Sequence, residues 1–227
     1  MSKSVIPKGL KCVIFDMDGV LYDSMKNHET TWVGCLKPEG IDFHPSEAYL
    51  HEGRTGFDTI GYAFKKYLNI EATQEDKERV YNEKVRLMGL APKAQKMPKM
   101  LELIQALKEQ GIDVWVVTGS KQPTLLDKLH GDFGIDPKQI ICARDVVNGK
   151  PHPEPYLKAV AGSGYKAEEC IVVENAPLGV RSAKAAGIIT IAVNTGILED
   201  EILESEAADV VLPDTKSLMP YFKSVLV

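Results

Sequence analysis

The sequence predicts an α/β fold, in which a parallel sheet is covered by helices on both faces and a block of helices is inserted near the start. From residue 98 onward, short apolar runs of strand length alternate with segments of helical periodicity. Residues 24–90 lack this alternation and show helical patterns instead. A chain of 227 residues is long enough for a core domain with a smaller insert.

The core elements follow from local patterns. Strands are expected where apolar or β-branched residues form a short run, and helices where apolar residues recur every three or four positions. The expected strands are 13–16, 114–117, 139–142, 170–173, 188–193 and 210–212. The expected helices of the core are 98–110, 122–130, 154–162, 177–186 and 216–224. Right-handed crossovers then give a parallel sheet.

The insert is expected to be entirely helical. A helix over 24–37 would begin at Ser24 as N-cap, and residues 38–50 are rich in turn formers. Further helices are expected at 57–69 and at 74–89, the last with Thr73 as its cap. No strand is expected between 24 and 111. We therefore predict a core domain of residues 1–24 and 92–227 and a four-helix cap domain of residues 25–91.

Composition limits the classes of partner. The net charge is −5, so the chain offers no general attraction to nucleic acid. No segment has the length and apolarity of a membrane span, and the first residues lack the long apolar run of a secretory signal. The four cysteines show no C-x-x-C spacing, and reduced buried thiols in a cytoplasmic protein are expected. We also expect a monomer.

The stretch 13–24, V-I-F-D-M-D-G-V-L-Y-D-S, places two acids directly after a predicted buried strand. Ligands of open parallel sheets bind at the carboxyl ends of the strands. There Asp16 can attack an electrophile while Asp18 handles a proton, which suits phosphoryl transfer through an aspartyl-phosphate. Mg²⁺ would bring the two anions together. The alternative is that both acids only make hydrogen bonds in a turn.

Three further strand ends carry polar groups. Thr118, Gly119 and Ser120 precede a helix and can hold a phosphate with hydroxyl and backbone N–H groups, unless Thr118 is simply a helix cap. Lys150 lies in a rigid turn, where an exposed lysine is the ordinary interpretation. Glu174 and Asn175 offer oxygens to a cation, or form a surface turn.

Together, D-M-D-G-V-L-Y-D-S, V-T-G-S, G-K-P-H-P-E-P-Y and V-E-N-A-P-L-G-V resemble the four motifs of the haloacid dehalogenase superfamily. The match extends over nearly the whole chain, and a helical insert after the first motif resembles the β-phosphoglucomutase-like phosphatases and mutases. The resemblance implies a Rossmann-like core, a mobile four-helix cap and bound Mg²⁺.

The resemblance also implies roles for the matched residues. Asp16 would be the nucleophile and a magnesium ligand, and Asp18 the acid and base, with its backbone carbonyl on the metal. Thr118 and Lys150 would bind the transferring phosphoryl group. The metal site would be completed by Glu174 and Asn175. Many relatives carry Asp at position 175, so a neutral Asn predicts weaker metal binding unless another carboxylate helps.

The insert decides the substrate, because it forms the far wall of the site. In H-E-G-R-T-G, residues 51–56, Glu52 precedes the glycine where β-phosphoglucomutases carry a lysine, and Arg54 can grip a phosphate bidentately. Lys84 on a later helix can reach the same space. The alternative for all three is a solvated charged face.

This loop, Lys84 and E-N-A-P-L-G look closest to the bacterial inorganic pyrophosphatases of the superfamily. Hydrolysis of pyrophosphate is therefore the leading expectation, with Arg54 and Lys84 on the leaving phosphate and Glu52 supporting the metal. The runner-up is a sugar-phosphate phosphatase or β-phosphoglucomutase, because His28 lies twelve residues after Asp16, as a hinge histidine does in the mutases. A catalytically silent binding protein on this fold is the alternative from another class. A true dehalogenase is disfavoured by the second acid and the paired magnesium groups.

Overall fold

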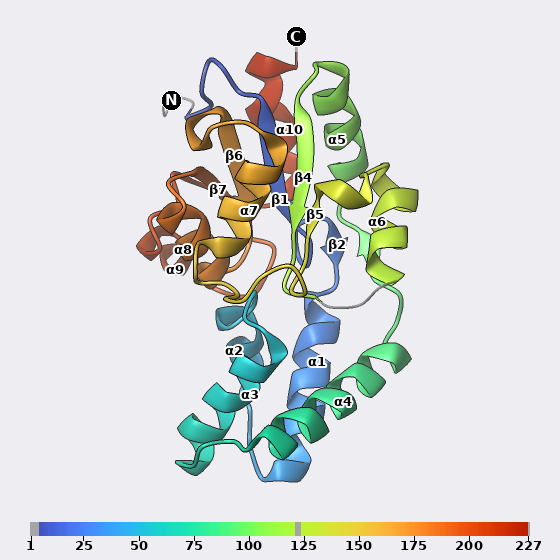
Figure 1. The fold of residues 1–227 in the computed structure, drawn as a ribbon, viewed down its shortest axis with the longest axis vertical. Coiled ribbons are helices and arrows are strands. Elements are labelled where there is room, and N and C mark those ends of the chain that lie inside the picture. The colour runs from blue at the N-terminus through green and yellow to red at the C-terminus, as the bar shows by residue number, and fades with distance from the viewer. Residues whose placement is uncertain (1–4, 121–123, 227) are drawn as a thin grey trace.

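The computed structural model describes residues 5–120 and 124–226, and Figure 1 shows a sheet with flanking helices above a separate group of helices. Six parallel strands form the sheet in the order β5-β4-β1-β6-β7-β8. The strands are β1 (Cys12–Asp16), β4 (Asp113–Val117), β5 (Ile140–Ile141), β6 (Cys170–Glu174), β7 (Ile189–Val193) and β8 (Val210–Leu212). The predicted α/β class is confirmed, and β5 is shorter than expected.

Helices cover both faces of this sheet. They are α5 (Met100–Glu109), α6 (Thr124–Phe133), α7 (Glu154–Ser163), α8 (Pro177–Ala185), α9 (Asp200–Ser205) and α10 (Leu218–Tyr221). The first two residues of the helix expected at 122–130 lie outside the described residues. The sequence did not predict α9, and the expected helix 216–224 is a shorter α10 flanked by 3₁₀ turns at Thr215–Ser217 and Phe222–Val225.

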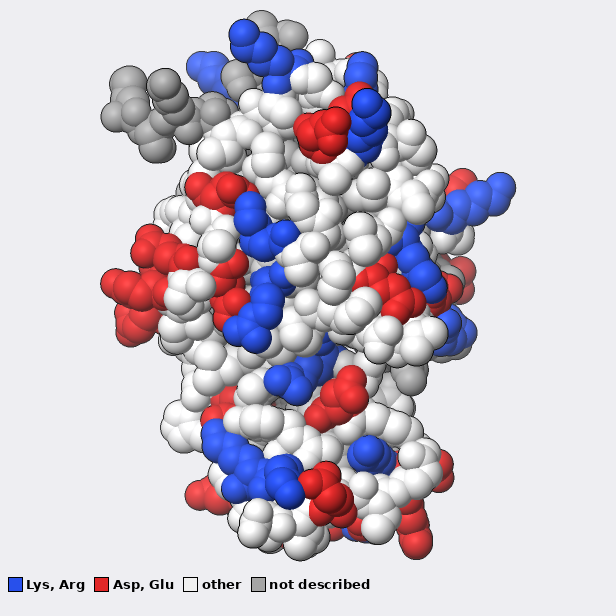
Figure 2. Space-filling model, turned by 60° about the vertical axis from the view of Figure 1, so that its left-hand side comes forward, with Lys and Arg blue, Asp and Glu red and all other residues white. Residues whose placement is uncertain are grey.

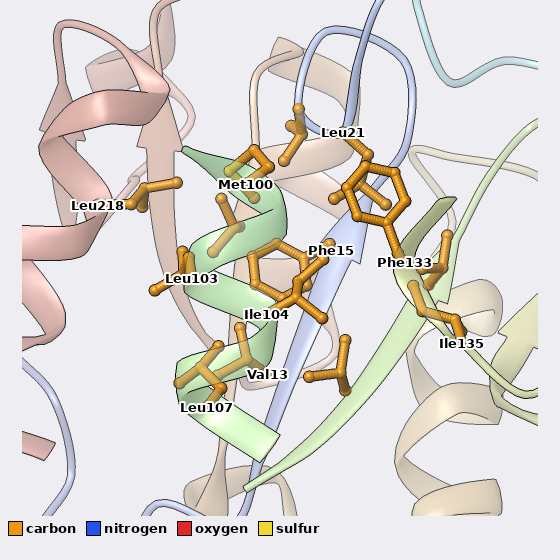
Figure 3. Close-up of a cluster of buried hydrophobic side chains, with 14 of the residues drawn as sticks. Val13, Phe15, Leu21, Met100, Leu103, Ile104, Leu107, Phe133, Ile135 and Leu218 are labelled. Carbon is orange, nitrogen blue, oxygen red and sulfur yellow. The ribbon is translucent and has the colours of Figure 1, made fainter. Parts of the chain in front are cut away.

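Alternate residues of the central strand enter different cores, as the period of two in a strand requires. Val13 and Phe15 pack with α5, and Figure 3 shows them among Leu103, Ile104 and Leu107. The intervening residues of β1 face the other layer, which contains α7 and α8. The sheet is thus buried on both sides, which explains the continuous apolar runs of its strands.

Residues 25–90 form a group of helices that we call the helical block, which has an apolar cluster of its own. Its helices are α1 (Met25–Leu36), α2 (Pro45–Leu50), α3 (Gly56–Ala63), continued by a π-helical turn at Phe64–Leu68, and α4 (Gln74–Leu90). A 3₁₀ turn at Lys37–Glu39 follows α1. The block lies beyond the carboxyl ends of the strands (Figure 1). The domain bounds 24/25 and 91/92 stay a prediction.

Three local expectations for the insert have a definite outcome. Thr73 caps α4 in a reciprocal capping box with Asp76, as predicted. The turn-rich stretch 38–50 also contains a helix that was not located from the sequence, α2, with the side chain of His44 accepting from the backbone N–H of Ser46. The expectation of no strand between 24 and 111 was wrong: β3 (Gln95–Lys96) pairs antiparallel with β2 (Tyr22–Asp23).

All four cysteines are buried and unpaired, as expected. Among the described residues, no helix combines the length and apolarity needed to cross a bilayer. On the face drawn in Figure 2, basic and acidic side chains are intermingled over both parts of the molecule.

Candidate active site

The polar residues that follow separate strands meet at the carboxyl edge of the sheet. Asp16 ends β1, Glu174 ends β6, Thr118 follows β4, and Lys150 lies in the loop before α7. All of them are almost completely buried, with exposed fractions of 0 to 5%. Charged groups are buried this deeply only when they have partners. The ordinary interpretation of Lys150 as an exposed lysine was therefore wrong.

Lys150 connects two of these carboxylates. Its Nζ donates to Oδ1 of Asp16 at 2.5 Å and to Oε1 of Glu174 at 2.6 Å. The hydroxyl of Tyr156, on α7, donates to the same Glu174 oxygen at 2.8 Å. Burial opposes the charge on Lys150, but the carboxylates of Asp16 and Glu174 outweigh it and hold the pKa of Lys150 well above its usual range. The lysine is thus a fixed ammonium beside the predicted nucleophile.

Asp16 keeps one oxygen free. Its Oδ2 is buried and has no hydrogen-bond partner, while Oδ1 accepts from Lys150. Burial raises the pKa of Asp16 to about 8, and the nearby carboxylates of Glu174 and Asp18 act in the same direction against the attraction of Lys150. Additional positive charge at this oxygen would favour the carboxylate form that a nucleophile needs.

Asp18 lies in a different environment from Asp16. Its Oδ1 accepts from the hydroxyl of Ser24 at 2.6 Å and lies 3.3 Å from Nε2 of His28. Burial opposes ionisation, but His28 and Ser24 outweigh it and lower the pKa of Asp18. Ser24 occupies the N-cap position of α1, yet its side chain makes no capping bond, because it binds Asp18 instead. Two neighbouring carboxyl groups thus have pKa values shifted in opposite directions.

Glu174 is held at the start of α8. Its Oε2 accepts from the backbone N–H groups of Asn175 and Ala176 at 2.8 and 3.0 Å. A Cβ at Gly179 would lie 1.7 Å from Oε1, so only glycine leaves room for this carboxylate. Both oxygens of Glu174 therefore have protein partners, and its predicted contribution to a metal site stays a prediction.

Asn175 links the core to the helical block. Its Nδ2 donates to Oε2 of Glu52 at 3.0 Å, while its Oδ1 is buried without a partner. Burial raises the pKa of Glu52 well above its usual range, and the charges of Asp16 and Glu174 add to the effect. The carboxylate of Glu52 thus lies against Asn175, where the sequence has a neutral amide in place of an acid.

The donor set fits a hard divalent cation. The two orphaned buried oxygens, Oδ2 of Asp16 and Oδ1 of Asn175, are the kind of ligand that Mg²⁺ prefers, with Glu52 beside them. Among the described residues, no three His, Cys, Asp or Glu side chains already form a ready ligand cluster. Near Asp16 and Glu174, the ammonium of Lys150 already contacts one oxygen of each carboxylate.

Thr118, Gly119 and Ser120 form the turn after β4. Oγ1 of Thr118 accepts from the backbone N–H of Ser120 at 3.1 Å, and the described part of α6 starts at Thr124. Because residues 121–123 lie outside the described residues, the helix-cap alternative for Thr118 stays open. Gly119 and Ser120 line a cavity of about 470 Å³ between the core and the helical block.

The helical block forms the far wall of this cavity. Glu52, Arg54 and Lys84 are half-buried and line it, as does His28, so they do not form a solvated face. Arg54 lies over the ring of Tyr62, with Cζ 5.5 Å from the centroid. Nζ of Lys84 lies 5.4 Å from the ring of Trp32, and burial lowers the pKa of Lys84 while Asp18 opposes the shift. Two cations thus face the acidic centre.

The loop between α2 and α3, residues 51–55, lies directly on the core through glycines. A Cβ on Gly53, which has φ +86°, would lie 2.7 Å from Cδ of Lys150. A Cβ on Gly119 would lie 3.3 Å from the carbonyl oxygen of Gly53, and one on Gly149 would lie 2.9 Å from Thr55. The glycines permit a backbone approach that side chains would block.

Sequence reasoning missed several residues of the site. Ser24 was assigned only to a helix cap, and Tyr156 was only part of a quoted motif. Glu47 on α2 and Tyr62 on α3 contact each other and His51 of the 51–55 loop, and no sequence motif pointed to these contacts.

Known proteins are similar to this chain in sequence and in fold. The profile of the haloacid dehalogenase-like hydrolases matches residues 10–187. Glycerol-1-phosphate phosphohydrolase 2 of Saccharomyces cerevisiae is 31% identical over 96% of this chain and 88% of its own length. Hexitol phosphatase A of Escherichia coli is 29% identical over 81% and 83%. A solved structure described as "Putative beta-phosphoglucomutase from Bacteroides vulgatus" superposes with a TM-score of 0.89 at 43% identity, covering 96% of this chain and 90% of the other.

The family match spans more than half of the chain and includes Asp16, Thr118, Lys150 and Glu174, the residues that meet at the sheet edge. The fold, with a six-stranded parallel sheet, agrees with that match. The chain therefore belongs to the haloacid dehalogenase-like hydrolase family.

Proposed function

We propose that this protein is a Mg²⁺-dependent phosphohydrolase that works through an aspartyl-phosphate on Asp16. The observation that carries the proposal is the pair of environments at Asp16, where one oxygen is held by Lys150 and the other is buried without a partner. Lys150 offsets the repulsion between a carboxylate and a phosphate. The bound Mg²⁺ would supply further charge neutralisation at the phosphoryl oxygens.

The residues divide the reaction into two steps. The reaction starts from the form of the site in which Asp18 carries a proton. An oxygen of Asp16 attacks phosphorus, and the bond from phosphorus to the leaving oxygen breaks while Asp18 gives its proton to that oxygen. Asp18 then takes a proton from water as the water oxygen attacks the aspartyl-phosphate. The bond between phosphorus and Asp16 breaks, which restores the carboxylate and releases phosphate. Thr118 and Lys150 hold the transferring group in both steps.

The substrates that we favour are phosphate esters of small sugars or polyols. The cavity of about 470 Å³ is larger than two phosphate groups require, and its lining includes apolar side chains such as Trp32 and Met88. Relatives named as a hexitol phosphatase and a glycerol-1-phosphate phosphohydrolase support the same class. A β-phosphoglucomutase of Bacillus subtilis is 26% identical over 89% of this chain, so transfer between positions of one sugar belongs to the same proposal.

Pyrophosphate is the second candidate, because of the charges on the loop side of the cavity. Arg54 and Lys84 face the acidic centre and would neutralise a leaving phosphate. Glu52, 3.0 Å from Asn175, would support the cation where the core lacks a second acid. A carboxylate in this place is better suited to binding a cation than to binding a sugar.

A substrate panel with and without Mg²⁺ tests the proposal. Glycerol 1-phosphate, hexitol phosphates, β-glucose 1-phosphate and pyrophosphate are compared by kcat/KM, and glucose phosphates are followed for interconversion. Highest kcat/KM on an ester supports the first class, and highest kcat/KM on pyrophosphate supports the second. The D16N variant should lose activity by a factor of at least about 10⁴. Retained activity in D16N would overturn the mechanism.

A further inference from the structure

Behind the 51–55 loop, a buried carboxylate joins the two helices that flank it. Glu47 on α2 is only 8% exposed. Its Oε2 accepts from the hydroxyl of Tyr62 at 2.8 Å, and its Oε1 accepts from Nζ of Lys66 at 2.5 Å. Tyr62 lies on α3 and Lys66 on the π-helical turn that continues it. Hydrogen bonds from Lys66 and Tyr62 outweigh burial and lower the pKa of Glu47, so the carboxylate is ionised at neutral pH.

The same carboxylate orients His51. Nε2 of His51 lies 3.3 Å from Oε2 of Glu47, and its ring packs on Tyr62 with centroids 3.9 Å apart. A carboxylate at Nε2 selects the tautomer that carries the proton there, which makes Nδ1 the acceptor nitrogen. Nδ1 is buried and has no partner.

Arg54 carries the complementary orphan. Its guanidinium lies over Tyr62, and its Nε–H donor is buried without a partner. Arg54 and His51 line the same cavity. One side chain therefore offers a buried donor and its neighbour in the cavity wall a buried acceptor. A buried donor or acceptor without a partner is costly, and a movement that joins these two recovers that cost.

We propose that Glu47 and His51 are positioning residues for Arg54. Glu47 fixes the ring of His51 and the ring of Tyr62, on which the guanidinium rests. When a phosphorylated ligand enters, Nε–H of Arg54 donates to Nδ1 of His51, and the remaining N–H groups of the guanidinium face the phosphate in its bidentate geometry. The inference deepens the second candidate of the proposed function, because it rests on Arg54 as the residue that binds the leaving phosphate of pyrophosphate, the one distant from Asp16.

The test uses the full chain and pyrophosphate, whose second phosphate is the one that Arg54 would bind. A parent protein that does not hydrolyse pyrophosphate would overturn the inference. We expect E47Q and H51L to raise KM about 5- to 10-fold with kcat within about twofold, since the contact acts on binding. The amide oxygen of H51N lies near the place of Nδ1, so H51N should recover most of the loss. E39Q is the matched control, because Glu39 pairs with Arg79 on the exposed side of the block. Its KM should equal that of the parent.

A double-mutant cycle separates positioning from general support of the fold. R54A should raise KM at least as much as E47Q, and E47Q should add less than about twofold in the R54A background. An equal effect of E47Q in both backgrounds would overturn the inference, as would a parental KM in E47Q or in H51L. If E47Q does not fold, as judged by its thermal transition, the comparison of H51L with H51N decides. Failure of the proposed function itself shows separately, as retained activity in D16N.

Discussion

The Nζ atom of Lys150 lies 2.5 Å from Oδ1 of Asp16, although the two residues are 134 positions apart in the sequence. The lysine also holds Glu174, and both carboxylates are buried. This ammonium thus offsets the charge of two buried carboxylates. We expect its removal to affect folding and catalysis together.

K150M is expected to lower the free energy of unfolding by about 3 kcal/mol, because two buried carboxylates lose their counter-charge. It should also reduce kcat at least about 100-fold through the loss of charge at the phosphoryl group. Urea denaturation and steady-state kinetics measure the two effects. K65M removes a lysine from an exposed ion pair with Glu71 and should change stability by less than about 0.5 kcal/mol. Parental kcat in a folded K150M protein would contradict the assignment.

G53A should hinder the approach of the 51–55 loop to the core. Gly53 has φ +86°, and a Cβ there would lie 2.7 Å from Lys150. A left-handed conformation costs a non-glycine residue about 1–2 kcal/mol, so kcat/KM should fall about tenfold or more. The control is G61A on α3, where the added Cβ has its nearest neighbour at 3.7 Å and φ is ordinary. Equal kcat/KM in the two variants would show that the close approach has no role.

N175D should tighten Mg²⁺ binding about tenfold, because a carboxylate replaces an amide beside Glu52. Without the metal the same change puts two carboxylates in contact, so the variant should melt at a lower temperature than the parent and recover as Mg²⁺ is added. Titrations of activity and of the melting temperature measure the affinity independently. N82D, on the exposed side of α4, should show neither effect. Unchanged or weaker affinity in N175D would remove Asn175 from the metal site.

Glu154 gives a pH-dependent contribution to the loop that carries Lys150. Its carboxylate accepts from the backbone N–H groups of Val147 and Asn148, both at 2.9 Å. These two bonds lower the pKa of Glu154 from 4.5 to about 2. A lowered pKa stabilises the folded state above the ordinary value, and this contribution is lost as the pH falls from about 4.5 toward 2.

We therefore expect E154Q to be less stable than the parent at pH 7 and the difference to shrink progressively below about pH 4.5. Urea denaturation of both proteins at pH 7, 5, 4 and 3.5 measures it. A difference that is constant over this range would show that the ionised carboxylate is not what orders the loop.

The sequence predicted the features that depend on local pattern. The strand ends at Asp16, Thr118 and Glu174 follow apolar runs, and the acids, hydroxyl and lysine were identified from their positions after such runs. The burial of Lys150 could not be predicted, because its partners come from two other strands. The α2 helix was missed because His44 caps it, and histidine is not among the usual capping residues. The strand β3 was missed because its two residues are exposed and polar.

The support behind Arg54 was also beyond the sequence. Glu47, His51 and Tyr62 are ordinary residues of an amphipathic helical segment until α2 and α3 are placed side by side. Ser24 was predicted as a helix cap from its position before α1. Its hydroxyl instead donates a hydrogen bond to Asp18. Side chains with two possible partners are assigned only by the tertiary structure.

The contact of Gly53 with Gly119 limits what can be processed. The backbone of the 51–55 loop lies against the core, so a substrate that reaches Asp16 would have to fit inside the cavity of about 470 Å³. A phosphate carried by a protein side chain or by a nucleic-acid strand brings a polymer that this volume does not hold. We therefore expect free metabolites of modest size to be better substrates than phosphorylated polymers.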